Sequence, residues 1–157
     1  MKIVHVAARS EIVAAQSLFR EYWESFGFSP CFQNFADEVA SLPGKYALPS
    51  GRLGLGLIDD EAVGCVALRQ VDAHRCEAKR LYVRNQFRGR GFGEQLLAWI
   101  IAEARAAGYR ELVGDTMPYM DRALAMYDRF GFIRTEPYSL DPTPGAIYLT
   151  LRLDVNG

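Results

Sequence analysis

A glycine-rich segment, residues 88–93, separates a predicted strand at 76–83 from a segment whose apolar residues recur at helical spacing. Gly108 is placed to end that helix, and residues 110–116 have the composition of a strand. A strand, a helix and a second strand in this order make a right-handed crossover. We therefore expect the two strands to lie parallel in one sheet, with the glycines at the entry to the helix.

The other apolar segments extend this sheet. Short polar connections between three strands predict an antiparallel meander at 53–58, 62–71 and 76–83. An opening strand and a closing hairpin are predicted at 2–7, 132–136 and 146–153. Besides the crossover helix, helices are predicted at 10–26, 35–42 and 121–130. We expect one α/β (α+β) domain over residues 1–157, a mixed and mostly antiparallel sheet of about seven strands flanked by about four helices.

Composition and charge indicate which partners and which cellular compartment to expect for this chain. The formal net charge of −1 gives no field that would attract nucleic acid or an acidic membrane. Residues 1–6 lack a long apolar stretch followed by a small-residue cleavage site, so no signal peptide is expected, and no 18 apolar residues run together. Cys31, Cys65 and Cys76 lack paired spacing, and the two histidines have no ligand pattern around them. We expect a cytoplasmic protein with reduced thiols and no metal, which binds neither nucleic acid nor a membrane.

The glycine-rich segment has the features of an anion site. Glycines can turn their N–H groups toward an anion, and the first N–H groups of the following helix are unsatisfied at its positive end. Five basic residues without an intervening acid surround it: Lys79, Arg80, Arg84, Arg88 and Arg90. A solvated loop would also explain this charge cluster.

Two familiar phosphate-binding motifs do not fit this segment. The Rossmann motif needs a third glycine where Glu94 stands, and the preceding strand belongs to a meander. The Walker motif needs Gly-Lys-Ser or Gly-Lys-Thr, which the chain lacks. Neither class of nucleotide-binding loop is therefore expected.

Arg88, Gly91 and Gly93 fit the pattern Arg/Gln-x-x-Gly-x-Gly/Ala at the start of a helix, which resembles motif A of the GNAT N-acetyltransferase superfamily. Residues 77–83 resemble the strand before that motif, and residues 124–132 resemble motif B. The resemblance implies an enzyme that moves the acetyl group of acetyl-coenzyme A to a primary amine of a small molecule or peptide. Transfer would be direct, within a ternary complex.

The resemblance also implies how the coenzyme binds. In the family, the pantetheine arm adds to the strand before motif A by backbone hydrogen bonds, which here means Leu81, Tyr82 and Val83. The pyrophosphate would lie on the N–H groups of Gly89, Arg90, Gly91, Phe92, Gly93 and Glu94. Arg88 and Arg90, with Arg84 as a third candidate, would meet phosphate oxygens.

Tyr127 occupies the motif B position that in many members of the family protonates the departing thiolate. A phenol with a pKa of about 10 is a reasonable donor for this step. Its helical spacing with apolar neighbours would equally suit a core tyrosine. The resemblance also implies that a backbone N–H near Leu81 holds the oxyanion.

Glu77 lies where some family members carry a glutamate that deprotonates the amine, directly or through water. A solvent-facing glutamate, or a partner for Lys79 or Arg80, would fit the sequence as well. Strand alternation puts Glu77, Lys79, Leu81 and Val83 on one face, unless a bulge breaks the count. The direction of the Glu77 side chain is left open by the sequence.

One position departs from the family pattern: many members carry an asparagine seven residues before the motif B tyrosine, and this chain has Met120. Thr116 and Asp121 are candidates to replace that contact with the coenzyme. Two other functions also fit the residues, a non-catalytic acyl-coenzyme A-binding module and a structural domain with a coincidental glycine turn. Family members often pair through the closing hairpin, so a homodimer is a further expectation.

The acceptor amine is not identified by the sequence. Its site should come from segments outside the coenzyme motifs, namely 23–32, the loop around Tyr46, and the loops after Thr116 and Glu136. These segments carry aromatic residues that would either wall an apolar pocket or belong to the core: Phe26, Phe28, Phe32, Tyr119 and Tyr138.

Overall fold

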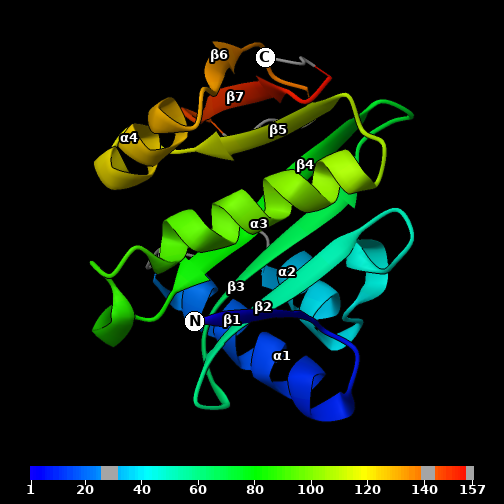
Figure 1. Ribbon diagram of the computed structural model, residues 1–157, viewed down its shortest axis with the longest axis vertical. Coiled ribbons are helices and arrows are strands. Elements are labelled where there is room, and N and C mark those ends of the chain that lie inside the picture. Colours follow the sequence, from blue (N-terminus) through cyan, green and yellow to red (C-terminus); the bar gives the residue numbers. More distant parts are fainter. Residues whose placement is uncertain (26–31, 139–143, 155–157) are drawn as a thin grey trace.

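The computed structural model describes residues 1–25, 32–138 and 144–154. Within them, seven strands form one sheet in the order β1-β2-β3-β4-β5-β7-β6 (Figure 1). The strands are β1 (Lys2–His5), β2 (Arg52–Ile58), β3 (Glu61–Gln70), β4 (Arg75–Val83), β5 (Glu111–Thr116), β6 (Ile133–Thr135) and β7 (Ile147–Arg152). The helices are α1 (Arg9–Glu24), α2 (Phe32–Ala40), α3 (Phe92–Ala106) and α4 (Asp121–Arg129), with short 3₁₀ helices η1 (Gly44–Tyr46) and η2 (Asn85–Phe87).

The predicted fold class is confirmed. Neighbouring strands pair antiparallel everywhere except between β4 and β5, the two strands that the α3 crossover connects. The two 3₁₀ helices were not predicted, and α2 begins three residues earlier than the spacing indicated. The predicted end of the first helix, with Phe26 and Phe28, and the thiol of Cys31 lie outside the described residues. None of the described helices is long and apolar enough to cross a membrane.

Helices cover both faces of the sheet. α3 lies across one face and buries the apolar stripe that its spacing predicted: Leu96, Leu97, Ile100, Ile101 and Ala104. α1 and α2 bury their apolar side chains against the other face, where Leu18, Phe19 and Phe35 are nearly inaccessible. Cys65 and Cys76 each lie in one of these cores, and burial raises the pKa of both thiols, that of Cys76 to about 12.

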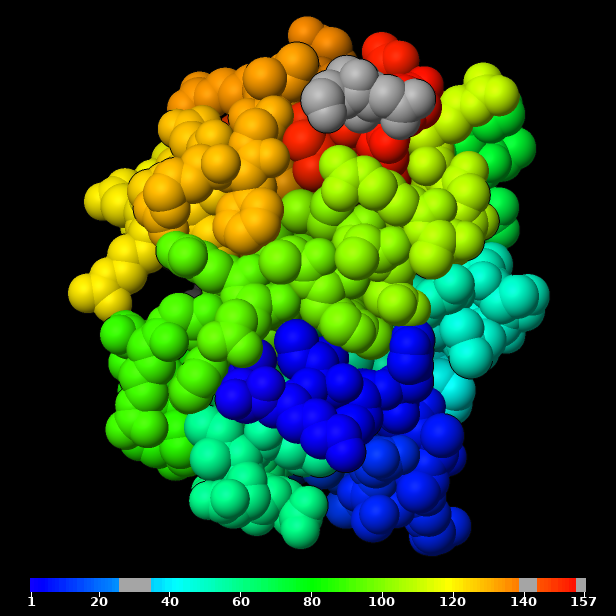
Figure 2. Space-filling view, in the orientation of Figure 1, coloured from blue at the N-terminus to red at the C-terminus, as the bar shows by residue number. Residues whose placement is uncertain are grey.

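β4 and β5 pair over only three residues each and then diverge. Their register joins Arg75 to Glu111, Cys76 to Leu112 and Glu77 to Val113. Beyond Glu77, the edge of β4 that faces β5 has no strand partner among the described residues. We call this opening the fork. Figure 2 shows the surface hollowed here, between the end of β4 with η2 (green) and the segment that leads into α4 (yellow).

A β-bulge lies beside the fork. Lys79 is paired with Ala67 and Tyr82 with Cys65, so Arg80 and Leu81 together oppose a single residue of β3. Arg80 has a φ of 59°, in the left-handed region, which costs an L-residue about 1–2 kcal/mol.

The bulge breaks the alternation that the sequence indicated for β4. Lys79 lies opposite Ala67, which belongs to the core under α1 and α2, and directly opposed residues share a face. Leu81 and Val83 pack instead with the core under α3. Glu77, Lys79, Leu81 and Val83 therefore do not share one face. The bulge that the sequence left open breaks the count, because its extra residue reverses the faces after Arg80.

Gly64→Ala is expected to destabilise the sheet next to the fork. A Cβ at Gly64 would lie 2.7 Å from the carbonyl oxygen of Tyr82 and 3.0 Å from Cδ1 of Leu96. Overpacking of this kind costs about 1–3 kcal/mol of unfolding free energy, which a urea midpoint measures. The control is Gly114→Ala, where the new Cβ would lie 3.7 Å from its nearest neighbour and the change should stay below about 1 kcal/mol. Equal midpoints for the two variants would contradict this packing.

Candidate active site

The glycine-rich segment lies at the open end of the fork, between η2 and α3. Gly89 and Gly91 both have a φ of 80°, which only glycine adopts readily. Gly91 is the N-cap of α3, and no side chain caps the helix there. The first N–H groups of α3 therefore remain unsatisfied at the positive end of the helix dipole. The structure thus brings the predicted cradle, residues 89–94, to a place suited to a phosphate.

Arg88 and Arg90 lie exposed beside this cradle. The Arg88 guanidinium donates from Nε to the carbonyl oxygen of Val83, at 2.9 Å, and lies over the ring of Tyr82. Arg90 lies over the ring of Phe87. Both arginines keep further N–H donors for an anion.

Arg84 is placed differently from the two other arginines. Its guanidinium donates to the carboxylate of Glu21 in α1, at 2.7 Å for Nη2, and to the carbonyl oxygen of Ala62. It therefore ties the end of β4 to α1 and β3. A phosphate would have to compete with Glu21 for this guanidinium, so Arg88 and Arg90 are the better candidates.

The carboxylate of Glu77 points into the face covered by α1 and α2 and is 4% exposed. It accepts hydrogen bonds from Nε of Arg69, at 2.6 Å, and from the hydroxyl of Tyr138, at 2.7 Å. Nζ of Lys79 lies 3.9 Å from Oε1. The direction of Glu77 is thus an inward one, with Arg69 rather than Lys79 or Arg80 as its main cationic partner.

Tyr138 was predicted only as an aromatic residue of an acceptor loop, and the structure places it as a partner of Glu77. Its ring packs edge-on against Tyr148 of β7. Burial raises the pKa of Tyr138, and the adjacent Glu77 charge raises it further, so the hydroxyl stays protonated as a donor to the carboxylate. No local sequence signal could reveal this contact, because 61 residues separate the two partners.

Tyr127 extends from α4 toward the fork. Its ring packs edge-on against Phe132, with 5.1 Å between centroids, and contacts the core under α3. Burial raises the pKa of Tyr127, and the proximity of Tyr22 and Asp115 raises it further. The hydroxyl therefore stays protonated at neutral pH, as a proton donor must be.

Met120 stands at the N-cap of α4, where its side chain cannot cap the helix. The hydroxyl of Thr116 donates to its sulfur at 3.4 Å. Of the two residues considered as replacements for the missing asparagine, Thr116 is therefore occupied within the protein. Among the described residues, no three His, Cys, Asp or Glu side chains gather as metal ligands would.

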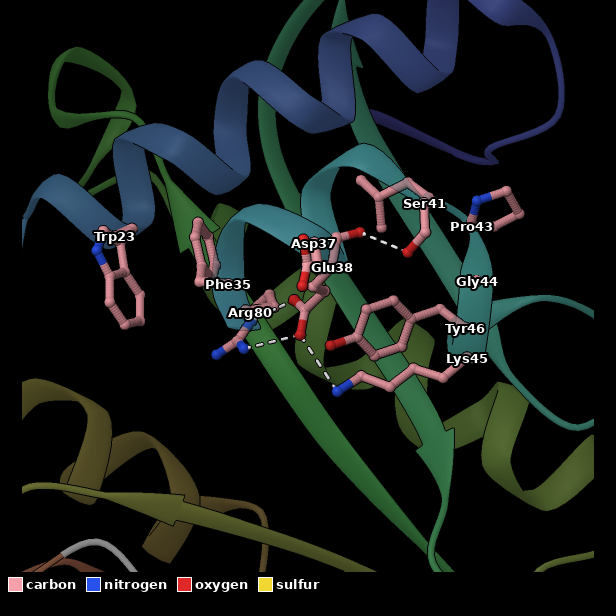
Figure 3. Close-up of a pocket in the computed structure, with 11 residues that line it drawn as sticks. Trp23, Phe35, Asp37, Glu38, Ser41, Pro43, Gly44, Lys45, Tyr46 and Arg80 are labelled. Atoms are coloured by element: carbon pink, nitrogen blue, oxygen red, sulfur yellow. Dashed lines mark hydrogen bonds and ion pairs between the residues drawn. The ribbon is translucent and has the colours of Figure 1, made fainter. Parts of the chain in front are cut away.

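A pocket of about 500 Å³ lies beneath α2, on the same face as Glu77 (Figure 3). Trp23 and Phe35 stack at one side of it, with 4.4 Å between ring centroids. The guanidinium of Arg80 donates twice to the carboxylate of Glu38, at 2.9 and 3.1 Å, and Nζ of Lys45 lies 3.2 Å away. Burial alone would raise the pKa of Glu38, but the two cations outweigh it and hold the pKa at about 2.

Glu38→Gln is expected to reduce the pH dependence of stability in acid. The pKa of Glu38 falls from 4.5 to about 2 on folding, so its ion pairs stabilise the protein fully above about pH 4.5 and are lost as the pH falls through 2. The shift corresponds to about 3 kcal/mol, and the 10% exposure of the side chain calls for little screening correction. Urea unfolding of wild type and variant should therefore give a stability gap that narrows between about pH 5 and about pH 2.

The control for this series is Glu94→Gln. Glu94 pairs with Arg129 at the surface, and both side chains are about half exposed, so this pair is worth less than about 1 kcal/mol. A gap between wild type and Glu38→Gln that stays constant over the acid range would show that Glu38 is not held ionised by its neighbours.

Known proteins resemble this chain in sequence and in structure. The sequence profile of the acetyltransferase (GNAT) family matches residues 14–132. An uncharacterised N-acetyltransferase of Schizosaccharomyces pombe is 39% identical over 139 residues, which cover 87% of this chain and 85% of that protein.

Two solved structures extend the comparison. A GNAT family acetyltransferase from Elizabethkingia anophelis, with acetyl-CoA bound, is 30% identical over 71% of this chain and 82% of its own, with a TM-score of 0.59. An acetyltransferase from Streptococcus agalactiae shares the fold, with a TM-score of 0.81 at 19% identity, over 97% of this chain and 98% of its own. These likenesses favour the predicted enzyme over a coenzyme-binding module or a structural domain. The chain belongs to the acetyltransferase (GNAT) family and is an acetyl-coenzyme A-dependent N-acetyltransferase.

Proposed function

We propose that the protein transfers the acetyl group of acetyl-coenzyme A directly to a primary amine of a small molecule or peptide, within a ternary complex. One observation supports this proposal: the fork leaves a free strand edge of β4 beyond Glu77, and the uncapped N-terminus of α3 lies at its open end. A thioester laid along the strand edge would meet the side chains of Tyr127 and Glu77. An amine could then reach it from the face covered by α1 and α2.

The coenzyme would occupy the place beside β4 that β5 leaves open. The backbone of Leu81, Tyr82 and Val83 would bind the pantetheine arm as an added strand. The pyrophosphate would lie on the N–H groups of residues 89–94, with Arg88 and Arg90 as charged donors. Arg129 holds the carboxylate of Glu94 in an ion pair, which reduces repulsion between that carboxylate and a phosphate.

The chemistry needs a neutral amine, a stabilised oxyanion and a proton for the thiolate. Glu77 would accept the proton of the amine, directly or through water, and the amine nitrogen would then bond to the carbonyl carbon of the acetyl group. The N–H of Leu81 would hold the oxyanion, since the bulge removes Leu81 from the regular pairing with β3. As the bond from carbon to sulfur breaks, the thiolate would take its proton from Tyr127.

The partners of Glu77 suit this role. Arg69 and Tyr138 each occupy one acceptor site, one on each carboxylate oxygen, and together they fix the direction of the group. Further lone pairs remain for an amine or a bridging water. Because the carboxylate is fixed before the substrate arrives, little ordering is left for the reaction step.

Gly91→Ala is expected to weaken acetyl-coenzyme A binding. A Cβ at Gly91 meets no atom within 4 Å, so its cost comes from the φ of 80° alone, about 1–2 kcal/mol for an L-residue. The free segment can relax from this conformation, and binding must restore it, which raises Kd roughly 5- to 30-fold in titration calorimetry.

Gly93→Ala is the matched control for Gly91→Ala. Gly93 has no left-handed φ, and a Cβ there would lie 3.9 Å from Met126 and Val83, at ordinary contact distance. Its Kd for acetyl-coenzyme A should stay within about twofold of wild type. If both variants bound equally well, the left-handed turn at Gly91 would not be part of the coenzyme site.

Tyr127→Phe is expected to lower kcat by about 100-fold while the Kd for acetyl-coenzyme A changes little, because only the proton of the departing thiolate is lost. Release of coenzyme A thiol, with a panel of polyamines, amino acids, aminoglycosides and peptide N-termini as acceptors, measures the reaction. Tyr119→Phe, at a residue 63% exposed, serves as the control. An unchanged kcat would remove Tyr127 as the acid, and no reaction with any acceptor class would contradict the proposed function.

A further inference from the structure

Lys79 and Asp115 face each other across the fork. Glu77 and Val113 form the last pair between β4 and β5, and Lys79 and Asp115 stand two residues beyond them on either strand. Side chains two residues apart share a face, so both point to the side of Glu77, the side covered by α1 and α2. The strands have already parted at this position. A cation and an anion therefore oppose each other where the strands no longer pair.

The ammonium of Lys79 shares its one carboxylate partner with Arg69. Its side chain is 23% exposed, and its nearest carboxylate oxygen belongs to Glu77, at 3.9 Å. That oxygen already accepts the hydrogen bond from Arg69. Burial lowers the pKa of Lys79, although the charge of Glu77 opposes this. A ligand anion that reached this partly buried ammonium would therefore form a favourable charge-assisted hydrogen bond with it.

The carboxylate of Asp115 also lacks a close partner of opposite charge. Among the ion pairs of 4.0 Å or less that the described residues make, none includes Asp115. The residue remains exposed, yet desolvation by the protein around it raises its pKa, and the charge of Glu77 adds to this. Lys79 acts on Asp115 in the opposite direction but is too far away to form an ion pair with it.

The other charges nearby on this face are paired within the protein. Arg69 is bound to Glu77, and Arg80 and Lys45 are bound to Glu38. Among the described residues, Lys79 has only its 3.9 Å ion pair with Glu77 and Asp115 has none, and the two lie on opposite sides of the fork. A ligand that carries both charges close together would satisfy both at once.

We propose that Lys79 and Asp115 select a free amino acid as the acceptor, with its carboxylate on Lys79 and its amino group on Asp115. This inference rests on the proposed function, because Asp115 stands two residues beyond the last pair of β4 and β5, at the edge along which the thioester would lie. Diamines and aminoglycosides would bring a second cation against Lys79. A peptide N-terminus would leave Lys79 without an anion.

The test compares free L-amino acids with their primary amides as acceptors, because the amide keeps the amino group and the side chain but removes the negative charge. For the accepted amino acids, kcat/KM should exceed that of the amide by roughly 10- to 100-fold, the range expected for one charge-assisted hydrogen bond. Lys79→Gln should remove most of this preference and leave kcat/KM for the amide within about threefold.

Asp115→Asn should lower kcat/KM for amino acid and amide alike, since both present the same amino group. Lys79→Arg, which keeps the positive charge, should retain a preference for the free acid. The Kd for acetyl-coenzyme A, measured on each variant, should be unchanged and reports whether the fold is intact.

The outcomes separate the two proposals. If polyamines, aminoglycosides or peptide N-termini are acetylated and free amino acids are not, the inference on Lys79 and Asp115 is overturned while the proposed function stands. Equal kcat/KM for acid and amide, or an equal loss for both in Lys79→Gln, overturns it as well. If no amine of any class is acetylated, both proposals fail.

Discussion

The ion pair between Arg80 and Glu38 holds the backbone feature on which the site depends. Arg80 is in a left-handed conformation that an arginine adopts only at a cost, and its guanidinium is fixed by the two hydrogen bonds that it donates to Glu38 of α2. The rings of Tyr22 and Phe35 lie within 5.5 Å of it. A buried ion pair adds little stability relative to well-packed apolar residues in its place, but every conformation that leaves one of its charges unpaired is disfavoured. The strained bulge of β4 is thereby kept in place.

The bulge divides β4 between two tasks. Before it, Glu77 and Lys79 face α1 and α2, where the acceptor would enter; after it, Leu81 and Val83 face the core under α3. A regular strand would have turned all four side chains to one side. Bulges also bend and twist a strand, which suits the divergence of β4 from β5 beginning just before this point. In the proposed function, one extra residue would thus separate the acceptor and coenzyme surfaces within a single strand.

The sequence predicted the parts of this protein that depend on local pattern. Apolar spacing indicated the helices and strands, and the alternating glycines indicated the cradle, because glycine adopts a left-handed φ most readily. The sequence left a bulge in β4 open but could not locate it, because its left-handed residue is Arg80, which carries no such signal. The role of Tyr138 and the place of Asp115 escaped prediction because they depend on which segments the assembled sheet brings beside Glu77 and Lys79.

The basic residues of positions 79–90 show why charge clustering alone could not assign a site. In the sequence they form one group, but the fold distributes them. Arg80 is bound to α2 and Arg84 to α1, whereas Arg88 and Arg90 lie exposed at the cradle and Lys79 faces the fork. A cation that already forms an ion pair within the protein contributes little binding energy to a ligand, because the ligand must replace the carboxylate of that pair. The pairing within the protein, more than position in the sequence, therefore decides which of these charges can serve a substrate.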